Sequence, residues 1–231
     1  MTPVPPEQTE PGRTVHGGTV PGGSADTRTG LPAGRPDVRT FDAADVEATR
    51  RLMYGLVVPR PIAWVTTVDA AGTVNLAPFS FFTVVSTRPA MMGLAITPDH
   101  TSEVHKDTWR NLDAGGELVI HSVSEANAAA MHVSSRPLPR ERSEVRELGL
   151  ATAPSDLVAP PRLVDADSAL ECRVETRLRP GQEEFFVVRV LRAHVSGALS
   201  DEVGHIDIAA LDPVARVGRH YAHLAEHYRL G

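Results

Sequence analysis

Cysteine is almost absent from this sequence of 231 residues, which contains a single one, Cys172. One thiol cannot form an intramolecular disulfide, and it cannot supply a zinc cluster built from several cysteines. A reducing, cytoplasmic location is therefore expected. Long apolar runs are also missing, because no stretch approaches the roughly 18 consecutive apolar residues of a membrane-spanning helix. The first residues lack the basic and then apolar pattern of a secretory signal, so no membrane association is expected.

Basic residues are also fewer than acidic ones. Lysine and arginine together number 23 against 29 aspartate and glutamate residues, which gives a formal net charge of −6. This balance argues against broad attraction to nucleic acid phosphates or to an anionic membrane surface. Lysine is the scarcest of the charged residues, because Lys106 is the only one in the chain. Its position is informative, since a composition that uses arginine everywhere else has kept this one lysine.

The first 40 residues differ from the rest in composition. They contain seven prolines and seven glycines, and only eight of them are apolar. Such a segment buries too little surface to offset the entropy of an ordered chain, so residues 1–40 are expected to be a disordered tail. The rest of the chain, residues 41–231, is expected to form the folded domain.

The pattern within 41–231 is mostly that of β-strands. β-Branched and apolar residues favour strands, and Asp69 to Gly72 predict a turn between two of them. The expected strands cover 62–68, 73–76, 79–86, 91–97, 117–123, 169–178 and 184–195. Helices are fewer and shorter. They are expected at 42–54 with Asp42 as N-cap, at 103–114, at 124–132 and, after a loop, within 212–229.

This arrangement predicts a mainly β fold, an antiparallel β-barrel with peripheral helices. A Rossmann fold is disfavoured, because no G-x-G-x-x-G follows a strand and strands do not alternate regularly with helices. Residues 169–178 alternate apolar and polar side chains, which places Cys172 on the same face as Leu170 and Val174. We therefore interpret Cys172 as a core thiol rather than a catalytic one.

Residues 75–82, with the sequence N-L-A-P-F-S-F-F, are the first candidate for chemistry. Pro78 has no backbone N–H and restricts the local backbone, so neighbouring peptide groups can be left for a ligand. The hydroxyl of Ser80 lies between aromatic residues, and a planar heterocycle with amide edges needs such a slot. A β-bulge at a barrel corner explains the same pattern, and from the pattern alone it is the better supported of the two.

Residues 102–112 are the second candidate. Asp107 or Thr108 can cap a helix there, which leaves backbone N–H groups and a positive dipole end beside Lys106. These groups suit a phosphate, and the hydroxyls of Thr66 and Thr67 on an earlier strand can add to them. An ordinary capped surface helix is the alternative.

Three histidines near the C-terminus, His220, His223 and His227, have the spacing of one helical face. A metal site on a single terminal helix is unusual, so a solvated face is the favoured interpretation and no metal is predicted. The chain also lacks the G-x-S-x-G, H-E-x-x-H and Walker patterns.

Taken together, three segments resemble the flavin reductase-like family of FMN-binding split barrels. They are L-V-V-P-R-P-I-A-W-V-T-T-V-D at 56–69 continuing into 75–82, K-D-T at 106–108, and D-P-V-A-R-V-G-R-H-Y at 212–221. The resemblance implies a six-stranded Greek-key split barrel that forms a homodimer, with FMN near the subunit interface. It implies that two groups of residues bind FMN. Asn75, Ala77, Pro78, Phe79 and Ser80 would line the isoalloxazine, and Thr66, Thr67, Lys106, Asp107 and Thr108 would hold the phosphate end.

The function implied by this resemblance is NAD(P)H-dependent reduction of FMN, with the electrons passed to free flavin, to an oxygenase or to another acceptor. The flavin implied by the resemblance carries the chemistry and the protein supplies position and electrostatics, so no protein nucleophile, acid or base is expected to be essential. Two alternatives stay open at this point. One is an electron-transfer flavoprotein whose tightly bound FMN is reduced by a protein partner. The other is a barrel that keeps the fold and serves as a non-enzymatic binding or structural module.

Overall fold

The structure is a computed structural model that describes residues 38–97 and 106–224. The chain divides into two units, Met1–Phe41 and Asp42–Gly231, and every described helix and strand belongs to the second. The predicted tail falls mostly on residues 1–37, outside the described part, and stays a prediction. Within the described ranges, no helix combines the length and the apolar character needed to cross a membrane.

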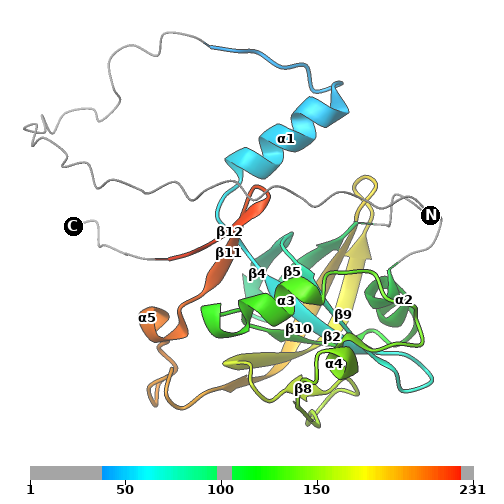
Figure 1. The fold of residues 1–231 in the computed structure, drawn as a ribbon, viewed down its shortest axis with the longest axis vertical. Helices are drawn as coiled ribbons and strands as arrows, with labels where there is room; N and C mark the ends of the chain where they lie inside the picture. Colours follow the sequence, from blue (N-terminus) through cyan, green and yellow to red (C-terminus); the bar gives the residue numbers. More distant parts are fainter. Residues whose placement is uncertain (1–37, 98–105, 225–231) are drawn as a thin grey trace, which may run out of the picture. The chain divides into compact units, whose positions relative to one another are not determined.

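An antiparallel sheet of seven strands forms the body of the second unit (Figure 1). Its order is β3-β2-β6-β9-β10-β5-β4, so β5 pairs with β10 instead of with the next strand along the chain. The strands are β2 Ala63–Val68, β3 Val74–Phe79, β4 Phe82–Thr87, β5 Ala90–Ile96, β6 Glu117–His121, β9 Ser168–Leu178 and β10 Glu184–Val195. The Ala95 N–H donates to Phe81 O at 2.9 Å, which ties the β3–β4 connection to β5 and curls the sheet.

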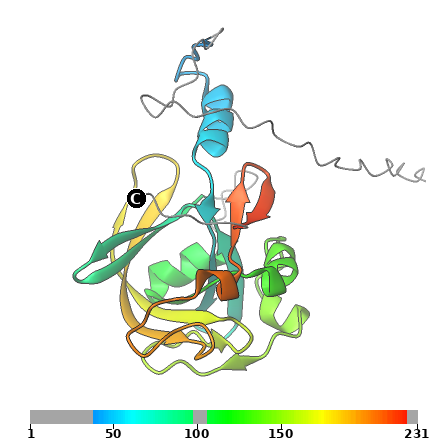
Figure 2. The same ribbon diagram turned by 90° about the vertical axis from the view of Figure 1, so that its left-hand side faces the viewer.

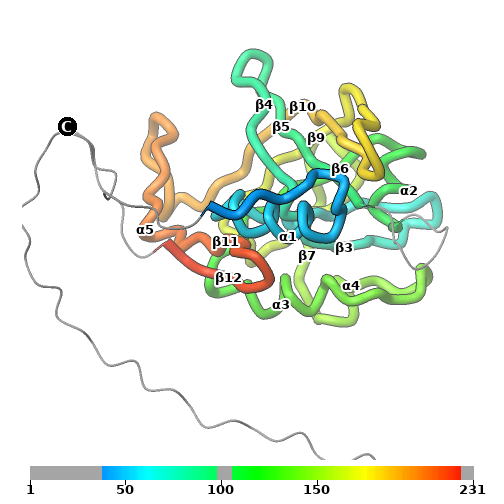
Figure 3. The backbone as a smooth tube through the Cα atoms, turned by 90° about the horizontal axis from the view of Figure 1, so that it is seen from above, coloured from blue at the N-terminus to red at the C-terminus, as the bar shows by residue number. Residues whose placement is uncertain are grey.

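The mainly β fold with few helices is confirmed, and its main sheet has seven strands, as the residue pattern predicts, instead of the six that the resemblance implies. Strand β4, at one edge of the sheet, pairs with β5 alone, and this hairpin projects from the sheet in two perpendicular views (Figures 2 and 3). A separate sheet has the order β1-β11-β12, with β1 Arg60–Pro61, β11 Val214–Val217 and β12 His220–His223. Two short strands, β7 Thr152–Ala153 and β8 Arg162–Leu163, form a third.

The prediction of a helix within 212–229 is wrong over 212–224, the part of this segment that the structure describes, because the chain forms two strands there. A short helix, α5 (Ile208–Leu211), ends at Asp212, whose φ is +43°, and the chain then enters the β11–β12 hairpin. Gly218 has a φ of +55°, and with Arg219 it forms the two-residue turn between Val217 and His220. Glycine is favoured in such hairpin turns because it adopts positive φ without a steric penalty.

The other helices begin at or after their expected first residues. Asp45, rather than Asp42, is the N-cap of α1 (Val46–Leu56), and its side chain accepts from the Ala48 N–H at 2.9 Å. The remaining helices are α2 Asp107–Ala114, the 3₁₀ turn η1 Glu125–Asn127, α3 Ala128–Val133 and α4 Glu144–Glu147. Helix α2 packs on β2 and β3, while α3 and α4 follow one another beside β3 (Figures 1 and 3).

Strand β2 is buried on both faces. Ala63 and Val65 belong to the core of the curled sheet, together with Leu94, Leu118, Phe186, Val188 and others. Trp64 belongs to a second core with Leu76, Met131, Val145 and Leu163, which lies under α3, α4 and the segment that follows them. Cys172 is fully buried in the first core, so its interpretation as a core thiol is confirmed. Burial raises the pKa of this thiol to about 12, which keeps it protonated and unreactive.

His121 on β6 is a buried polar group that ties the sheet to β8. Its Nδ1 lies 2.9 Å from Trp64 O, which can only accept, so Nδ1 carries the proton. Its Nε2 accepts from the Leu163 N–H at 3.0 Å. Burial lowers the pKa of His121 to about 4, despite the opposing effect of the bond to Trp64 O. The neutral ring is therefore the form compatible with the folded state.

The buried neutral His121 predicts a loss of stability in mild acid. Its pKa is about 4 in the folded chain and about 6.5 in the unfolded chain, so the stabilisation is complete above pH 6.5 and falls as the pH approaches 4. Between about pH 7.5 and pH 5 the expected loss is about 2 kcal/mol of unfolding free energy. Urea unfolding of His121→Gln should lack this part of the pH dependence. The exposed control His205→Gln should retain it, and an unchanged pH dependence in His121→Gln would contradict the prediction.

Candidate functional site

A cavity of about 620 Å³ opens between the β3–β4 connection, the end of α1, the C-terminal part of α3 and the β11–β12 hairpin. A volume of this size accommodates a cofactor-sized ligand. Aromatic, apolar and cationic side chains share its wall. The lining residues are Arg50, Tyr54, Arg60, Ile62, Pro78, Phe79, Ser80, Phe81, Ala95, Thr97, Lys106, Met131, His132, Ser135, Arg216, Gly218, Arg219 and Tyr221.

One wall of the cavity is the segment Pro78 to Phe81. The pairing of β2 with β3 runs without a register shift from Ala63↔Phe79 to Val68↔Val74, so residues 75–79 do not form the β-bulge considered as an alternative. Strand β3 is an edge strand, where a proline costs no ladder hydrogen bond. Ser80 and Phe81 then connect β3 to β4 and face the cavity.

Lys106 joins this wall from the start of α2. Its Nζ lies 5.6 Å from the centre of the Phe79 ring, which is within cation–π range. Lys106 is itself the N-cap residue of α2 and makes no side-chain capping bond. The expected cap by Asp107 or Thr108 is therefore wrong. The backbone N–H groups of the first helical turn lie beside the lysine, as expected for an anion site.

The other predicted site residues lie beneath α2 rather than on the cavity wall. Thr108 is buried and its hydroxyl accepts from Asn75 Nδ2 at 2.8 Å, while Thr67 accepts from Asn111 Nδ2 at 3.0 Å. Asp107 forms an ion pair with Arg140 at 3.9 Å. Asn75, Thr67 and Thr108 are thus brought together as supports of α2.

Ala77 and Thr66 are also absent from the residues that line the cavity. Ala77 packs against the core of the curled sheet. Thr66 points to the opposite face of β2 from Thr67, and its hydroxyl donates to Pro161 O at 2.7 Å. Of the ten predicted residues, the structure therefore places Pro78, Phe79, Ser80 and Lys106 on the cavity wall.

Sequence reasoning missed an arginine-rich wall contributed by α1 and the small sheet. Arg60 is only 6% exposed, and its Nη1 donates to Tyr54 O at 2.9 Å and to Val57 O at 3.0 Å. Burial, and then the charge of Arg216, lower the pKa of Arg60. The guanidinium of Arg216 lies 4.6 Å from the centre of the Tyr221 ring. Both arginines occur in the recognised motifs, but no local pattern shows that they share a cavity.

A buried hydrogen bond holds the α3 side of the cavity in place. Trp64 Nε1 donates to Ser134 Oγ at 2.9 Å, and Ser134 Oγ in turn donates to Met131 O at 2.8 Å. This fixes the end of α3 on the outer face of β2. His132 on the same turn reaches the β11–β12 hairpin, where its Nδ1 lies 3.1 Å from the hydroxyl of Tyr221.

Comparison with known proteins identifies the family. A model of the flavin reductase like domain matches residues 53–225. The chain belongs to the flavin reductase-like family. An uncharacterized protein of Halalkalibacterium halodurans, BH2278, is 41% identical over 198 residues, which cover 82% of this chain and 93% of that protein.

Solved structures agree with this assignment. Nitrilotriacetate monooxygenase component B from Bacillus cereus matches with a TM-score of 0.79 at 28% identity, covering 84% of this chain and 99% of that one. A protein with a split barrel domain from Shewanella frigidimarina matches with a TM-score of 0.71 at 20% identity, covering 81% and 93% of the two chains. At the latter identity the match shows the fold alone. The split-barrel fold of this flavin reductase-like protein is confirmed.

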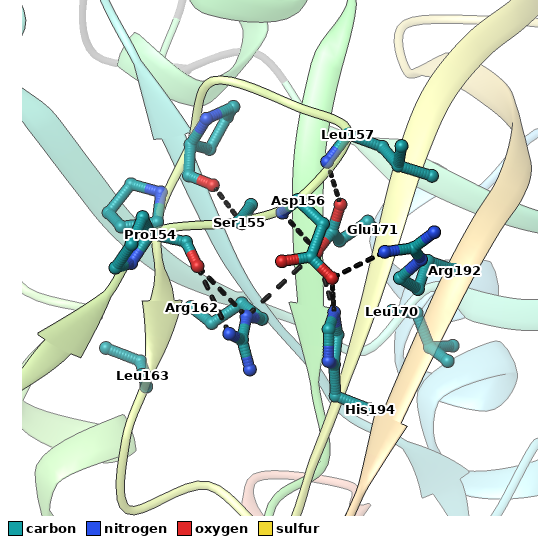
Figure 4. Close-up of polar contacts among 12 residues, drawn as sticks. Pro154, Ser155, Asp156, Leu157, Arg162, Leu163, Leu170, Glu171, Arg192 and His194 are labelled. Carbon is teal, nitrogen blue, oxygen red and sulfur yellow. Dashed lines mark hydrogen bonds and ion pairs between the residues drawn. The ribbon is translucent and has the colours of Figure 1, made fainter.

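Outside the cavity, this flavin reductase-like protein has a group of side chains that resembles a metal site. Ligand atoms of Asp156, Glu171 and His194 lie within 4.8 Å of one another (Figure 4). Glu171 is fully buried, and its carboxylate accepts from the Asp156 N–H at 2.9 Å and the Leu157 N–H at 2.6 Å. His194 Nε2 lies 2.7 Å from the same carboxylate.

Arginines balance the charge of this group. Arg192 pairs with Asp156 at 2.6 Å, and Arg162 lies 4.0 Å from Glu171. The carboxylates are thus occupied by N–H donors, and the group holds the segment before β8 on β9 and β10. Burial by itself raises the pKa of Glu171. The hydrogen bonds with the backbone N–H groups and with His194 together lower it by more, so the pKa lies below its usual value. Glu171 is therefore a structural anion.

The three C-terminal histidines do not form the expected helical face. His220 and His223 lie in β12, where residues three apart point to opposite faces, and His227 is outside the described residues.

Removal of the Glu171 charge should destabilise the fold far more than removal of an exposed carboxylate on the same strand. Glu171→Gln places an amide NH₂ against backbone N–H donors, and the expected loss is about 2 to 3 kcal/mol of unfolding free energy near neutral pH. Glu175→Gln breaks an exposed pair with Arg189 and should cost less than about 1 kcal/mol. Urea denaturation of both variants measures the difference, and equal losses would show that Glu171 does not anchor this segment.

Proposed function

We propose that this protein is a flavin-dependent oxidoreductase in which NAD(P)H reduces FMN bound in the 620 Å³ cavity. The observation that carries the proposal is the wall formed by Pro78, Phe79 and Ser80 with Lys106 beside it, in a chain of the flavin reductase-like family. Bound FMN would in this way supply electrons to free flavin or to another acceptor. The 28% identity to a monooxygenase component supports an oxygenase as one such acceptor.

The residues of the cavity fit the parts of FMN. An isoalloxazine ring system has apolar faces and amide edges, which suit the proline, the aromatic rings and the serine of the segment from Pro78 to Phe81. A phosphate suits Lys106 and the N–H groups at the start of α2, where the N-cap residue Lys106 makes no side-chain capping bond. Asn75, Thr67 and Thr108 support this helix from below and so act through its position.

FMN would supply the acceptance of hydride and the release of electrons singly or in pairs. The protein's own residues bind and orient the ligand. Tyr54 and Phe81 pack edge to face, with ring centres 5.6 Å apart, and form a rigid aromatic edge to the cavity. Cys172 does not take part, because it is buried in the core and its pKa is raised.

The visible spectrum tests the proposal directly. Purified protein titrated with FMN should bind it, and anaerobic NADH or NADPH should bleach the bound flavin within seconds. Bound flavin that stays oxidised with both nucleotides, yet is reduced by a protein partner, would favour the electron-transfer alternative. A protein that binds no flavin would overturn the proposal.

Replacement of Lys106 should weaken the binding of FMN but not of riboflavin. Loss of one charge-assisted contact to phosphate predicts a rise of about 10-fold or more in the dissociation constant of FMN for Lys106→Ala. Riboflavin has the same ring without the phosphate, so its affinity should be unchanged. Flavin fluorescence measures both constants, with Arg146→Ala as a control away from the cavity. Equal weakening of the two ligands would place Lys106 at the ring instead of the phosphate.

We further propose that the protein is a homodimer. An apolar groove of about 350 Å³ is lined by Pro59, Phe82, Met92, Leu170 and other apolar residues, and the β4–β5 hairpin that borders it exposes Val84 and Val85. Apolar surface of this kind is typical of surfaces that bind another chain. A second copy is the occupant expected from the family resemblance.

Light scattering should therefore give about twice the chain mass of 24.8 kDa for the wild type. Val84→Asp places a charge on the exposed hairpin and should shift the mass toward the monomer without unfolding it. Val203→Asp, at an exposed position on the loop before α5, should leave the dimer intact. A wild type that measures 24.8 kDa at micromolar concentration would contradict the proposal.

A further inference from the structure

Two arginines lie directly opposite one another in the small sheet. Arg60 of β1 is the register partner of Arg216 of β11. Like charges placed opposite in an antiparallel pair destabilise it, because the side chains of such partners approach closely. A pair of this kind is costly unless a negative group lies between or beside the two guanidiniums.

The chain supplies no such group among its described residues. The hydrogen bonds of Arg60 go to the backbone carbonyls of Tyr54, Val57 and Gly218, and no described carboxylate forms an ion pair with Arg60 or Arg216. Arg60 is nine-tenths buried, so its charge is largely removed from water. Its Nε is fully buried and has no hydrogen-bond partner in the described part of the chain. Burying a cation without an opposite charge is unfavourable.

The two guanidiniums are also held in place. The carbonyl of Gly218, in the β11–β12 turn, accepts from Arg60 Nη2 at 3.4 Å and from Arg216 Nε at 3.2 Å. Packing of Arg216 on the Tyr221 ring fixes its plane. Its terminal nitrogens have no partner in the described residues, and Arg219 from the same turn also faces the cavity. Rigid guanidiniums with available donors suit the oxygens of a phosphate.

We propose that Arg60, Arg216 and Arg219 form a phosphate subsite, separate from Lys106, that binds a phosphate of a dinucleotide in the cavity. This inference rests on the proposed flavin-dependent function. FMN carries one phosphate, which Lys106 takes, so a second cationic position implies a ligand with further phosphate. Two dinucleotides have this chemistry: FAD, if the protein accepts it in place of FMN, and the nicotinamide nucleotide that donates the hydride.

The test compares Arg216→Gln and Arg219→Gln with the wild type, because Arg60 is buried and its replacement can prevent folding. Arg189→Gln, an exposed arginine on β10, is the matched control. Flavin fluorescence gives the dissociation constants of FMN and FAD. Steady-state oxidation of NADH and NADPH with saturating FMN gives KM and kcat.

The subsite predicts a selective effect of about 10-fold in Arg216→Gln and a smaller one in Arg219→Gln. If FAD is the source of the phosphate, its dissociation constant rises while that of FMN does not. If the nicotinamide nucleotide is the source, its KM rises while kcat and the affinity for FMN stay unchanged. Arg189→Gln should change none of these constants.

Two results would overturn the subsite. FMN weakened as much as FAD would mean that the arginines hold the single phosphate of the flavin, and unchanged constants would mean that they hold none. If the wild type binds no flavin, the proposed function fails, and inorganic pyrophosphate then tests the subsite alone. It should raise the melting temperature of the wild type and of Arg189→Gln but not of Arg216→Gln. No shift in the wild type would overturn the subsite as well.

Discussion

The burial of β2 on both faces is the constraint on which the rest of this structure depends. One face of the strand completes the core of the curled sheet, and the other carries Trp64 into the second core. A strand covered on both sides requires that each of its polar side chains finds a partner. Thr66 therefore bonds to Pro161 O and Thr67 to Asn111, which fixes the covering segment on one side and α2 on the other. The indole of Trp64 fixes α3 in the same way. Of these covering elements, α3 contributes Met131 and His132 to the cavity wall, and Lys106 joins the wall from the start of α2.

The same constraint explains which parts of the site the sequence could predict. Contiguous motifs point to one wall of the cavity: Pro78 to Ser80 lie in one strand and its exit, and Lys106 belongs to the K-D-T segment at the start of α2. The threonines of β2 could not be placed in this way, because a hydroxyl suits a phosphate and a backbone carbonyl equally well. Only the segment that packs on the outer face, some 95 residues later, decides that Thr66 donates to Pro161 O.

The C-terminal hairpin shows a different limit of sequence reasoning. His220, His223 and His227 have a spacing that also fits one face of a helix, whereas the described residues 214–217 and 220–223 form strands. Pairing of β11 with β1 decides the outcome, since Val214 and Ala215 become buried when the strand forms. Gly218 is the residue of this segment that indicates a turn, because glycine adopts the positive φ found there. The arginine wall was missed with the hairpin, because Arg60 and Arg216 meet only through this long-range pairing.

The distribution of charge gives the cavity its character. In a chain with a net charge of −6, several acidic side chains outside the cavity pair with arginines: Glu171 with Arg162, Glu175 with Arg189 and Glu184 with Arg179. The cavity wall, in contrast, gathers Arg60, Arg216, Arg219 and Lys106 without a described carboxylate among its lining residues. A concave site lined by charge of one sign concentrates its field and attracts anions from solution. The overall negative charge therefore does not oppose the binding of phosphorylated nucleotides, because the local arrangement of charge, rather than the total, decides what the cavity binds.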